Sequence, residues 1–296
     1  MKTIIVRIAE GLGNQLFMYA NAYAFSKKKN YNLKVDNKSG YFKISNQVRK
    51  YELNNFNIYA DLCDEKYRFD NYISNIKRKI LKKIDNYKSK KSFLLEDSKN
   101  KLISYKDYTN KNYSNLLFLE GHFESEKYFQ EYSKDIKNQF IIKKNNIEID
   151  NKYLNDIKNS NSVSICIRQH RFSERGSIDK EKSNKFTFDT INYVKKSVEY
   201  FKKNIPNSKF FIWSNDFSNL NNYFNTNEYT FIENSINKSI NDFNLFKYCK
   251  HFIVGPTSFH WWGAWLNENK NKICLRPSNI NPSNNKDFWP EKWIKI

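Results

Sequence analysis

Several residue types and patterns are scarce in this 296-residue chain, which has 7 glycines, 5 prolines and 4 cysteines. The cysteines stand far apart, at Cys63, Cys166, Cys249 and Cys274. Their spacing excludes a disulfide framework and a paired-cysteine zinc site, and it fits a reducing cytoplasm. No run approaches the ~20 apolar residues of a membrane span. The N-terminal segment also lacks the layout of a signal peptide, so we expect a soluble or peripheral protein.

Asp-x-Asp pairs are absent as well. Such an acidic pair commonly coordinates a divalent cation, which in turn binds a diphosphate. The sequence therefore predicts no metal site, and protein groups would have to neutralise any bound diphosphate.

Hydrophobic residues make up 39% of the chain and aromatic residues 17%, which is typical of a folded globular protein. The 51 Lys and Arg against 31 Asp and Glu give a net charge of +20, which favours acidic partners. Lysine and asparagine are abundant throughout, so part of this charge reflects compositional bias. One alternative is therefore a protein that binds RNA or an anionic surface. No nucleic-acid motif appears and the basic residues are dispersed, so we expect no nucleic-acid partner.

Strand-like and helical segments alternate along the chain in two successive blocks. The first block covers residues 1–155 and includes a Lys/Asn-rich insertion at 61–115, and the second block covers 156–296. This order predicts an α/β protein with two doubly wound parallel sheets, each binding ligands at the carboxyl ends of its strands.

Helical periodicity predicts two buried faces in the second block. A helix from about Thr187 has an apolar face made of Ile191, Val194, Val198 and Phe201. The tryptophans of "GPTSFHWWGAWLN" are expected in the core, because large aromatics at helical spacing usually pack.

The opening stretch "TIIVRIAEGLGNQLFMYANAYAFS" combines a strand, Thr3–Ala9, with a helix, Gln15–Ser26. Glu10–Asn14 forms the turn, whose glycines permit positive φ and close approach of a ligand. Leu16 stands where a dinucleotide fingerprint requires its third glycine, so that interpretation is weak. The alternative is a turn that only connects strand to helix.

Three segments of the second block carry groups suited to an anion or a nucleotide. Arg168 ends the strand of "SICIRQHR" and offers a fork of donors to a phosphate. Ser214 and Asp216 end the next strand and could contact a base or ribose. Thr257 and Ser258 start a helix, where bare N–H groups favour anions. The alternatives are an ordinary salt bridge, an Asx turn and plain N-capping.

Four segments together resemble the family 11 glycosyltransferases, the α-1,2-fucosyltransferases: "EGLGNQLFMYANAYA", "EGHFESEKYF", "FIWSNDF" and "CKHFIVGPTSFHWWGAWLN". The resemblance implies a GT-B fold of two Rossmann-like domains facing a central cleft. It also implies inverting, metal-independent transfer of L-fucose or a related deoxy sugar from a GDP-sugar, with no cofactor. The 2-hydroxyl of an oligosaccharide or lipid-linked glycan would accept the sugar, in the synthesis of a bacterial surface polysaccharide such as O-antigen.

The resemblance also implies site residues. The C-terminal domain would hold the donor through Arg168, Ser214, Asp216 and the helix start Thr257, Ser258 and Phe259. Gly13 and Asn14 would contact the donor and acceptor from the N-terminal domain. Position at a strand end makes Glu10 the first candidate for the catalytic base. Glu124, Glu174 and His122 are the further candidates.

This sequence departs from the family pattern at several places. The family motif His-x-Arg-Arg-Gly-Asp is Cys166-Ile167-Arg168-Gln169-His170-Arg171 here, so only the first arginine remains. Glu10 stands where the family usually has glycine. Pro256 and His260 replace an asparagine and a serine. A catalytically degenerate relative that only binds a sugar nucleotide is therefore a second alternative.

One segment outside the resemblance is amphipathic. Ile73, Ile76, Ile80 and Ile84 share a helical face, flanked by Lys77, Arg78, Lys79, Lys82 and Lys83. One interpretation is a helix packed on its own domain, with its lysines in solvent. The other is a helix lying on an anionic inner membrane.

Overall fold

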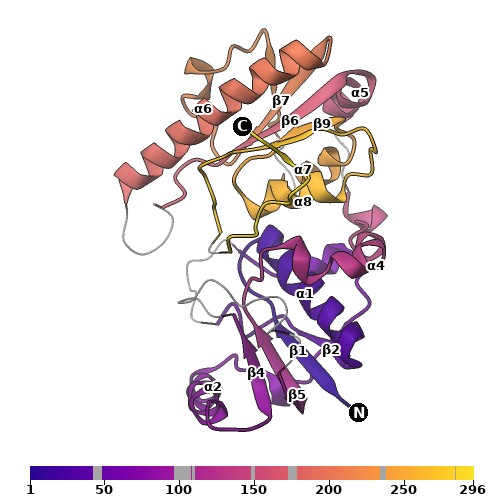
Figure 1. Cartoon of the computed structure of the whole chain (residues 1–296), viewed down its shortest axis with the longest axis vertical. Helices are drawn as coiled ribbons and strands as arrows, with labels where there is room; N and C mark the ends of the chain where they lie inside the picture. Colours follow the sequence, from indigo (N-terminus) through magenta and orange to yellow (C-terminus); the bar gives the residue numbers. More distant parts are fainter. Residues whose placement is uncertain are drawn as a thin grey trace. The chain divides into compact units, whose positions relative to one another are not determined.

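Figure 1 shows the computed structural model, which describes residues 1–42, 49–96, 108, 111–147, 151–172, 179–233, 238–283 and 285–296. The chain forms two compact units. The N-terminal unit comprises Met1–Lys143 with Ser283–Phe288, and the C-terminal unit comprises Lys144–Pro282 with Trp289–Ile296. The division therefore falls before the expected position at residue 155. The helix α5 (Asn151–Asn159) belongs to the C-terminal unit because it packs against that unit's strand β6 (Asn161–Ile167).

The N-terminal unit contains a five-stranded sheet in the order β3-β2-β1-β5-β4, with every pair parallel. Its strands are β1 (Thr3–Arg7), β2 (Asn32–Asp36), β3 (Asp61–Leu62), β4 (Lys91–Leu95) and β5 (Tyr113–Glu120). Its helices are α1 (Leu12–Lys29), α2 (Tyr72–Asp85) and α4 (Ser133–Gln139), with 3₁₀ turns at Leu53–Asn55, Glu65–Tyr67, Glu126–Tyr128 and Gln130–Tyr132.

The helix α1 begins earlier than its sequence pattern predicts. Gly11 is its N-cap and Leu12 its first residue, so Gly13 and Asn14 lie in the first helical turn rather than in the loop. The loop is confined to Ile8–Gly11. Nearly every side of α1 is buried, including the polar side chains of Gln15 and Asn21, and this explains why its apolar periodicity is blurred.

The described residues of the Lys/Asn-rich segment 61–115 build part of the N-terminal unit. They contribute the strands β3 and β4 and the helix α2, and β5 begins at Tyr113. Both strands lie at sheet edges, where short and polar strands are common. Their sequences are therefore not apolar enough to stand out from the surrounding Lys/Asn-rich segment.

The C-terminal unit contains a six-stranded sheet in the order β11-β10-β9-β6-β7-β8, again with every pair parallel. The other strands are β7 (Ser208–Ser214), β8 (Tyr229–Phe231), β9 (His251–Ile253), β10 (Cys274–Arg276) and β11 (Ile294–Lys295). The other helices are α6 (Lys180–Asn204), α7 (Lys238–Phe246) and α8 (Ser258–Leu266), with 3₁₀ turns at Lys144–Asn146 and Leu220–Asn222.

The predicted buried faces of the C-terminal unit are confirmed. The apolar face of α6 packs into one core cluster with β6 and β7, although the helix starts at Lys180, capped by Asp179. The three tryptophans of α8 are also buried. Both predicted parallel sheets are present, so the α/β class is confirmed.

Candidate active site

The C-terminal unit has a topological switch point between β6 and β9. From β6 the chain adds β7 and β8 on one side, then returns to the other side of β6 for β9, β10 and β11. In open parallel sheets, ligands bind outside the carboxyl ends of the strands at such a point. The chain segments leaving β6 and β9 are therefore the first place to look for a site.

Strand register brings the three predicted segments to this edge. Ile165 pairs with Ile253 of β9 and with Ile212 of β7. Arg168 directly follows β6, three residues after Ile165, so it is level with Pro256 and Asn215, and Asp216 and Thr257 come next. We call this set the C-terminal edge: Arg168, Gln169, His170, Arg171, Ser214, Asn215, Asp216, Pro256, Thr257 and Ser258.

Gly255 allows the segment after β9 to pass close to β6. A Cβ atom at this position would lie 2.0 Å from the carbonyl oxygen of Cys166, so only glycine fits. The helix α8 follows at once, with Thr257 as its N-cap, whose hydroxyl accepts from the N–H of His260 at 3.2 Å. The positive end of the α8 dipole therefore lies at the switch point, as an anion site requires.

Arg171 connects the segments after β6 and β9. Its Nη1 donates to the carbonyl of Pro256 at 3.2 Å, and its Nη2 donates to that of Pro282 at 2.6 Å. Phe186 lies 5.2 Å from its guanidinium carbon. Arg171 is thus a positioning residue that the sequence analysis did not identify. Arg168, half-buried directly after β6, is the arginine at the switch point itself.

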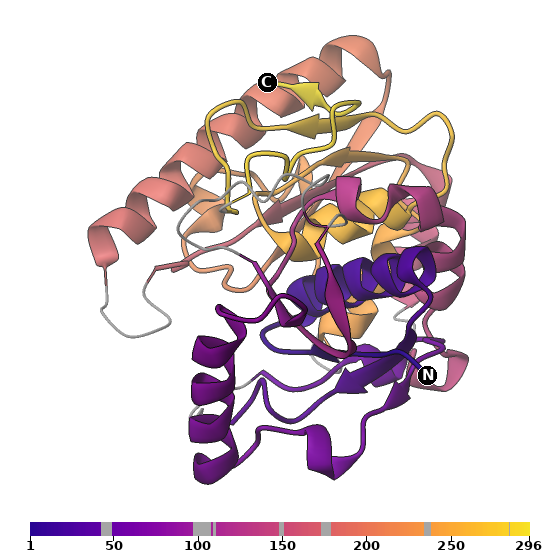
Figure 2. The same ribbon diagram turned by 60° about the horizontal axis from the view of Figure 1, so that its bottom comes forward.

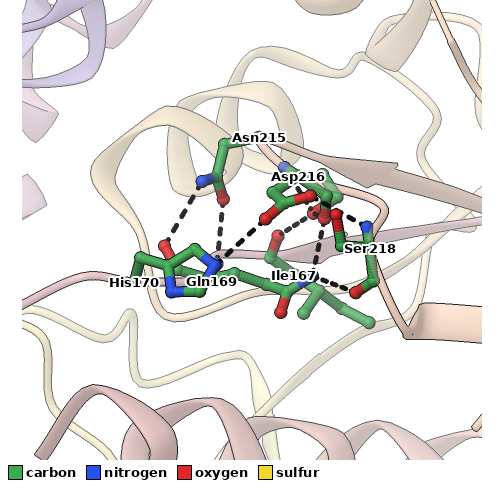
Figure 3. Close-up of polar contacts among 7 residues, drawn as sticks. Ile167, Gln169, His170, Asn215, Asp216 and Ser218 are labelled. Atoms are coloured by element: carbon green, nitrogen blue, oxygen red, sulfur yellow. Dashed lines mark hydrogen bonds and ion pairs between the residues drawn. The ribbon is translucent and has the colours of Figure 1, made fainter. Parts of the chain in front are cut away.

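Figure 3 shows how side chains join the ends of β6 and β7. The side-chain oxygen of Asn215 accepts from the N–H of Gln169 at 2.8 Å, and its Nδ2 donates to the Gln169 carbonyl at 3.3 Å. Gln169 Nε2 donates to the carbonyls of Asp216 (2.7 Å) and Ser218 (3.1 Å). The buried hydroxyl of Ser214 donates to the Ile167 carbonyl at 2.9 Å. These contacts hold the edge in one conformation.

Asp216 presents a fixed carboxylate at this edge (Figure 3). One oxygen accepts from the N–H of Ser218 at 2.8 Å, and the other lies 3.0 Å from Nε2 of His170. The hydrogen bonds from Ser218, with that of His170, lower the pKa of Asp216. It is therefore charged at neutral pH, and each of its oxygens can accept a further hydrogen bond.

His260 faces the core and not the C-terminal edge. Its Nδ1 accepts from the N–H of Gly255 at 3.0 Å, so its Nε2 carries the proton and donates to Ser164 Oγ at 2.7 Å. Burial lowers the pKa of His260 to about 3. This neutral histidine therefore holds the Gly255 segment against β6. The neighbouring ring of Phe259 packs on Phe243 and Phe246.

The N-terminal unit has its own switch point, between β1 and β5. Glu10, after β1, has a φ of 69°. Its carboxylate accepts from Arg49 Nη1 at 3.2 Å, and its carbonyl accepts from the buried Gln15 Nε2 at 2.9 Å. Gly40 lies close to the segment after β1, because a Cβ atom at position 40 would lie 1.8 Å from the Ile8 carbonyl oxygen.

Carboxylates also hold the segment after β5. Glu96 accepts from the N–H groups of His122 (2.6 Å) and Phe123 (3.0 Å). His122 and Glu124 thus follow the strand adjacent to β1, and Glu174 lies outside the described residues. The sequence analysis missed Arg49, Gln15 and Glu96, whose role depends on contacts distant in sequence.

The family pattern has a glycine at the positions of Glu10 and His170, and both residues have a positive φ in this chain. Glu10 has a φ of 69° and His170 a φ of 56°. A left-handed conformation is costly for residues with a Cβ atom, and glycine adopts it freely. The left-handed backbone conformation thus accounts for glycine in the family pattern. This chain keeps that conformation at both positions with residues other than glycine.

Among the described residues, no group of three or more His, Cys, Asp or Glu is arranged to hold a metal ion. Within the same part of the chain, none of the helices combines the length and apolarity needed to span a lipid bilayer.

Two parallel α/β sheets, with an arginine and a helix N-terminus at one switch point, define a doubly wound protein suited to an anionic ligand. Over residues 3–296 the chain matches Glycosyl transferase family 11, and it belongs to that family. The protein is therefore a glycosyltransferase, as its sequence motifs predicted.

Curated relatives match over almost their whole lengths. The chain is 30% identical to an alpha-1,2-colitosyltransferase of Escherichia coli, with 100% of this chain and 99% of the relative covered. It is 27% identical to the O-antigen biosynthesis glycosyltransferase WbnK of Escherichia coli, with 98% and 99% covered. The solved structure of the fucosyltransferase NodZ from Bradyrhizobium has a similar fold, with a TM-score of 0.54, 11% identity, and 95% and 96% covered.

Proposed function

We propose that this glycosyltransferase transfers a deoxy sugar from a GDP carrier to the 2-hydroxyl of a glycan, with inversion at the anomeric carbon and without a metal ion. The acceptor would be an oligosaccharide or lipid-linked glycan of a bacterial surface polysaccharide. The observation that carries the proposal is the C-terminal edge, where Arg168, Asp216 and the start of α8 follow three adjacent strands.

In this proposal the diphosphate lies between Arg168 and Ser258. The acceptor oxygen attacks the anomeric carbon, the bond from that carbon to the β-phosphate oxygen breaks, and GDP leaves with the bonding electrons. Negative charge then grows on the β-phosphate. A guanidinium fork and the N–H groups of a helix start stabilise that charge by hydrogen bonds that strengthen as it develops.

Guanine would be recognised by the carboxylate of Asp216. A guanine edge presents two N–H donors side by side, and a carboxylate can accept both. The contacts from Ser218 and His170 already orient this carboxylate and keep it charged. The Ser214 hydroxyl is buried and donates to the main chain, so it stabilises the end of β7 that carries Asp216.

We propose a GT-B organisation in which the C-terminal unit binds the donor and the N-terminal unit serves the acceptor. Gly13 and Asn14, in the first turn of α1, would contact the sugars from that unit. Glu10 would take the proton of the acceptor hydroxyl, and Arg49 would hold its carboxylate in place. His122 and Glu124 are the other candidates for this role.

Fucose and colitose are the donor sugars to compare first. NodZ α-1,6-fucosyltransferase, a protein of similar fold, has been soaked with GDP-fucose and crystallised with GDP. The 30% identity to an alpha-1,2-colitosyltransferase makes GDP-colitose the other donor to test. We also propose a cytoplasmic location, because the four cysteines are buried and their wide spacing in the sequence fits a reducing compartment.

Titration calorimetry with free nucleotides in a chelator tests the proposal. GDP should bind more tightly than UDP, ADP or CMP. Asp216→Asn should reduce the preference for guanine more than the affinity for phosphate, and Ser258→Ala should do the reverse. Tight UDP binding, or turnover that a chelator abolishes and manganese restores, would contradict the proposal. GDP binding without transfer to any glycan would favour the degenerate relative.

A further inference from the structure

The helix α2 packs with its polar side inward and its apolar side outward. It lies at the margin of the N-terminal unit beside β4, as Figure 1 and Figure 2 both show. Ile73, Ile76, Ile80 and Ile84 are exposed to 82%, 58%, 52% and 48%. The interpretation that this isoleucine face packs on its own domain is therefore wrong. We call these four residues the isoleucine stripe.

Ionic contacts fix this orientation. Arg78 and Lys82, on the inward side of α2, both form ion pairs with the buried Glu120 at the end of β5. Asp85 is buried as well, and its carboxylate accepts from the N–H groups of Ser92 (2.7 Å) and Phe93 (3.0 Å) of β4. Turning the stripe inward would break all these contacts, so its exposure is a stable feature of the fold.

Both ends of the stripe carry exposed aromatic residues. Tyr72 begins α2 and Tyr87 follows it, and both side chains are largely exposed. Monomeric proteins rarely expose contiguous apolar residues of this size without a partner. Tyrosines are suited to the boundary between a polar and an apolar phase, since their rings are apolar and their hydroxyls polar.

The exposed charged residues of α2 beside the stripe are all lysines. Lys77, Lys79 and Lys83 are exposed beside it, and Lys88 and Lys90 follow the helix. From Tyr72 to Ile84 the helix has no acidic residue, and Asp85 faces inward. An apolar face bordered by lysines fits an interface of lipid chains and anionic headgroups. A second copy docked through the same face would oppose lysine to lysine, which is unfavourable.

We propose that the isoleucine stripe and its lysines form a membrane-binding surface, with α2 lying in the headgroup region of an anionic phospholipid bilayer. The isoleucines enter the acyl boundary and the lysines contact the headgroup phosphates. This inference goes beyond the proposed function and does not depend on the donor sugar.

Vesicle flotation of the full chain tests the surface. The protein should float with phosphatidylcholine vesicles that contain phosphatidylglycerol, and roughly tenfold less with pure phosphatidylcholine or in high salt. Ile76→Ser with Ile80→Ser should abolish flotation. The matched control, Ile141→Ser with Phe188→Ser, removes two equally exposed apolar side chains elsewhere and should float normally.

A charge-matched pair of variants tests the lysines. Lys77→Gln, Lys79→Gln and Lys83→Gln together should lower partitioning by about tenfold or more. The same three changes at Lys195, Lys196 and Lys203 of α6 remove equal net charge and should have a much smaller effect. Equal losses in both triple variants would mean that only net charge matters, and they would overturn the proposal.

A fluorescent label reports which side of the protein meets the lipid. The four native cysteines are buried, so an environment-sensitive label can be placed selectively at Ile76→Cys, with Ile141→Cys as the control. Anionic vesicles should brighten and blue-shift the label at position 76 alone. No change at position 76 overturns the proposal. So does a dimer in light scattering that Ile76→Ser with Ile80→Ser dissociates, because the face would then be a protein interface.

Discussion

The two units have the same sheet architecture but opposite chemistry at their switch points. In the C-terminal unit the segments after β6 and β9 present Arg168 and the start of α8, groups that bind anions. In the N-terminal unit the strand ends carry carboxylates: Glu10 and Glu96 follow β1 and β4, and the buried Glu120 is the last residue of β5. The same parallel-sheet architecture therefore carries groups that bind anions at one switch point and carboxylates at the other.

The units also differ in how they hold these edges. Hydrogen bonds hold the C-terminal edge: Asn215 and His260 accept from main-chain N–H groups, and Arg171 donates to a carbonyl. In the N-terminal unit, ion pairs hold the carboxylates: Glu10 with Arg49, and Glu120 with Arg78 and Lys82. We therefore expect variants of the first edge to affect donor chemistry, and variants of the second to affect stability or proton transfer. The following experiments test that division.

The largest effect is expected from Arg168→Lys. Lysine keeps the charge but loses the two-pronged fork, so transition-state stabilisation should fall by about 2–4 kcal/mol, on the scale of one lost oxyanion donor. Steady-state kcat/KM measures this loss, and the melting temperature should stay close to that of the wild type. A variant that transfers sugar at the wild-type rate would remove Arg168 from the pyrophosphate site.

Glu120→Gln should be nearly as severe, but for folding. It leaves Arg78 and Lys82 half-buried without their anion, which should lower the free energy of unfolding by about 2–4 kcal/mol. Urea denaturation at neutral pH measures the change. Glu131→Gln is the matched control, because its ion pair with Lys28 is largely exposed, and it should cost under about 1 kcal/mol.

The same carboxylate predicts acid sensitivity. Burial alone would raise the pKa of Glu120, but Arg78 and Lys82 outweigh burial and lower it. Because the folded pKa lies below the ordinary value, this stabilisation is present above the ordinary carboxyl range. It is lost as pH falls through the folded pKa. The difference between wild type and Glu120→Gln should therefore shrink in acid, and a constant difference would contradict the ion-pair assignment.

His260 predicts a smaller pH dependence in the C-terminal unit. Its pKa is lowered to about 3 in the folded state, against an ordinary value of 6.5, so only the unfolded chain binds the proton between these values. Stability should fall by about 1.4 kcal/mol per pH unit below ~6.5, or about 2 kcal/mol by pH 5. Denaturation of wild type and His260→Gln across this range measures it. Equal pH slopes would show that His260 does not titrate as described.

The smallest expected effect concerns the two positive φ angles. Glu10→Gly and Glu10→Ala both lose the ion pair with Arg49, but only alanine keeps a Cβ at φ 69°. The glycine variant should be about 1 kcal/mol the more stable, and the same order should hold for His170→Gly and His170→Ala. At Lys196, inside α6, alanine should exceed glycine by a similar amount. The same order at all three positions would rule out the backbone explanation.

Local sequence patterns predicted much of the fold. The period of Ile191, Val194, Val198 and Phe201 identified the buried face of α6, because that helix has one apolar side against a sheet. The strand ends at Arg168 and Ser214 and the helix start at Thr257 were predicted from the sequence, and parallel register brings them to one edge. The start of α1 was placed too late, because a helix buried on nearly all sides has no clear period.

What the sequence by itself determined is the alternation of strands and helices, the residues at the strand ends and the family motifs, since all of these depend on neighbours along the chain. The tertiary structure alone decided which side of α2 is buried, which proton His260 carries and which cation Glu10 faces. Two of these depend on a partner distant in sequence, Glu120 for α2 and Arg49 for Glu10, and the proton of His260 depends on the fold that brings the N–H of Gly255 to its Nδ1. Periodicity shows that a helix has two faces, but the free energy of a buried ion pair decides which face turns inward.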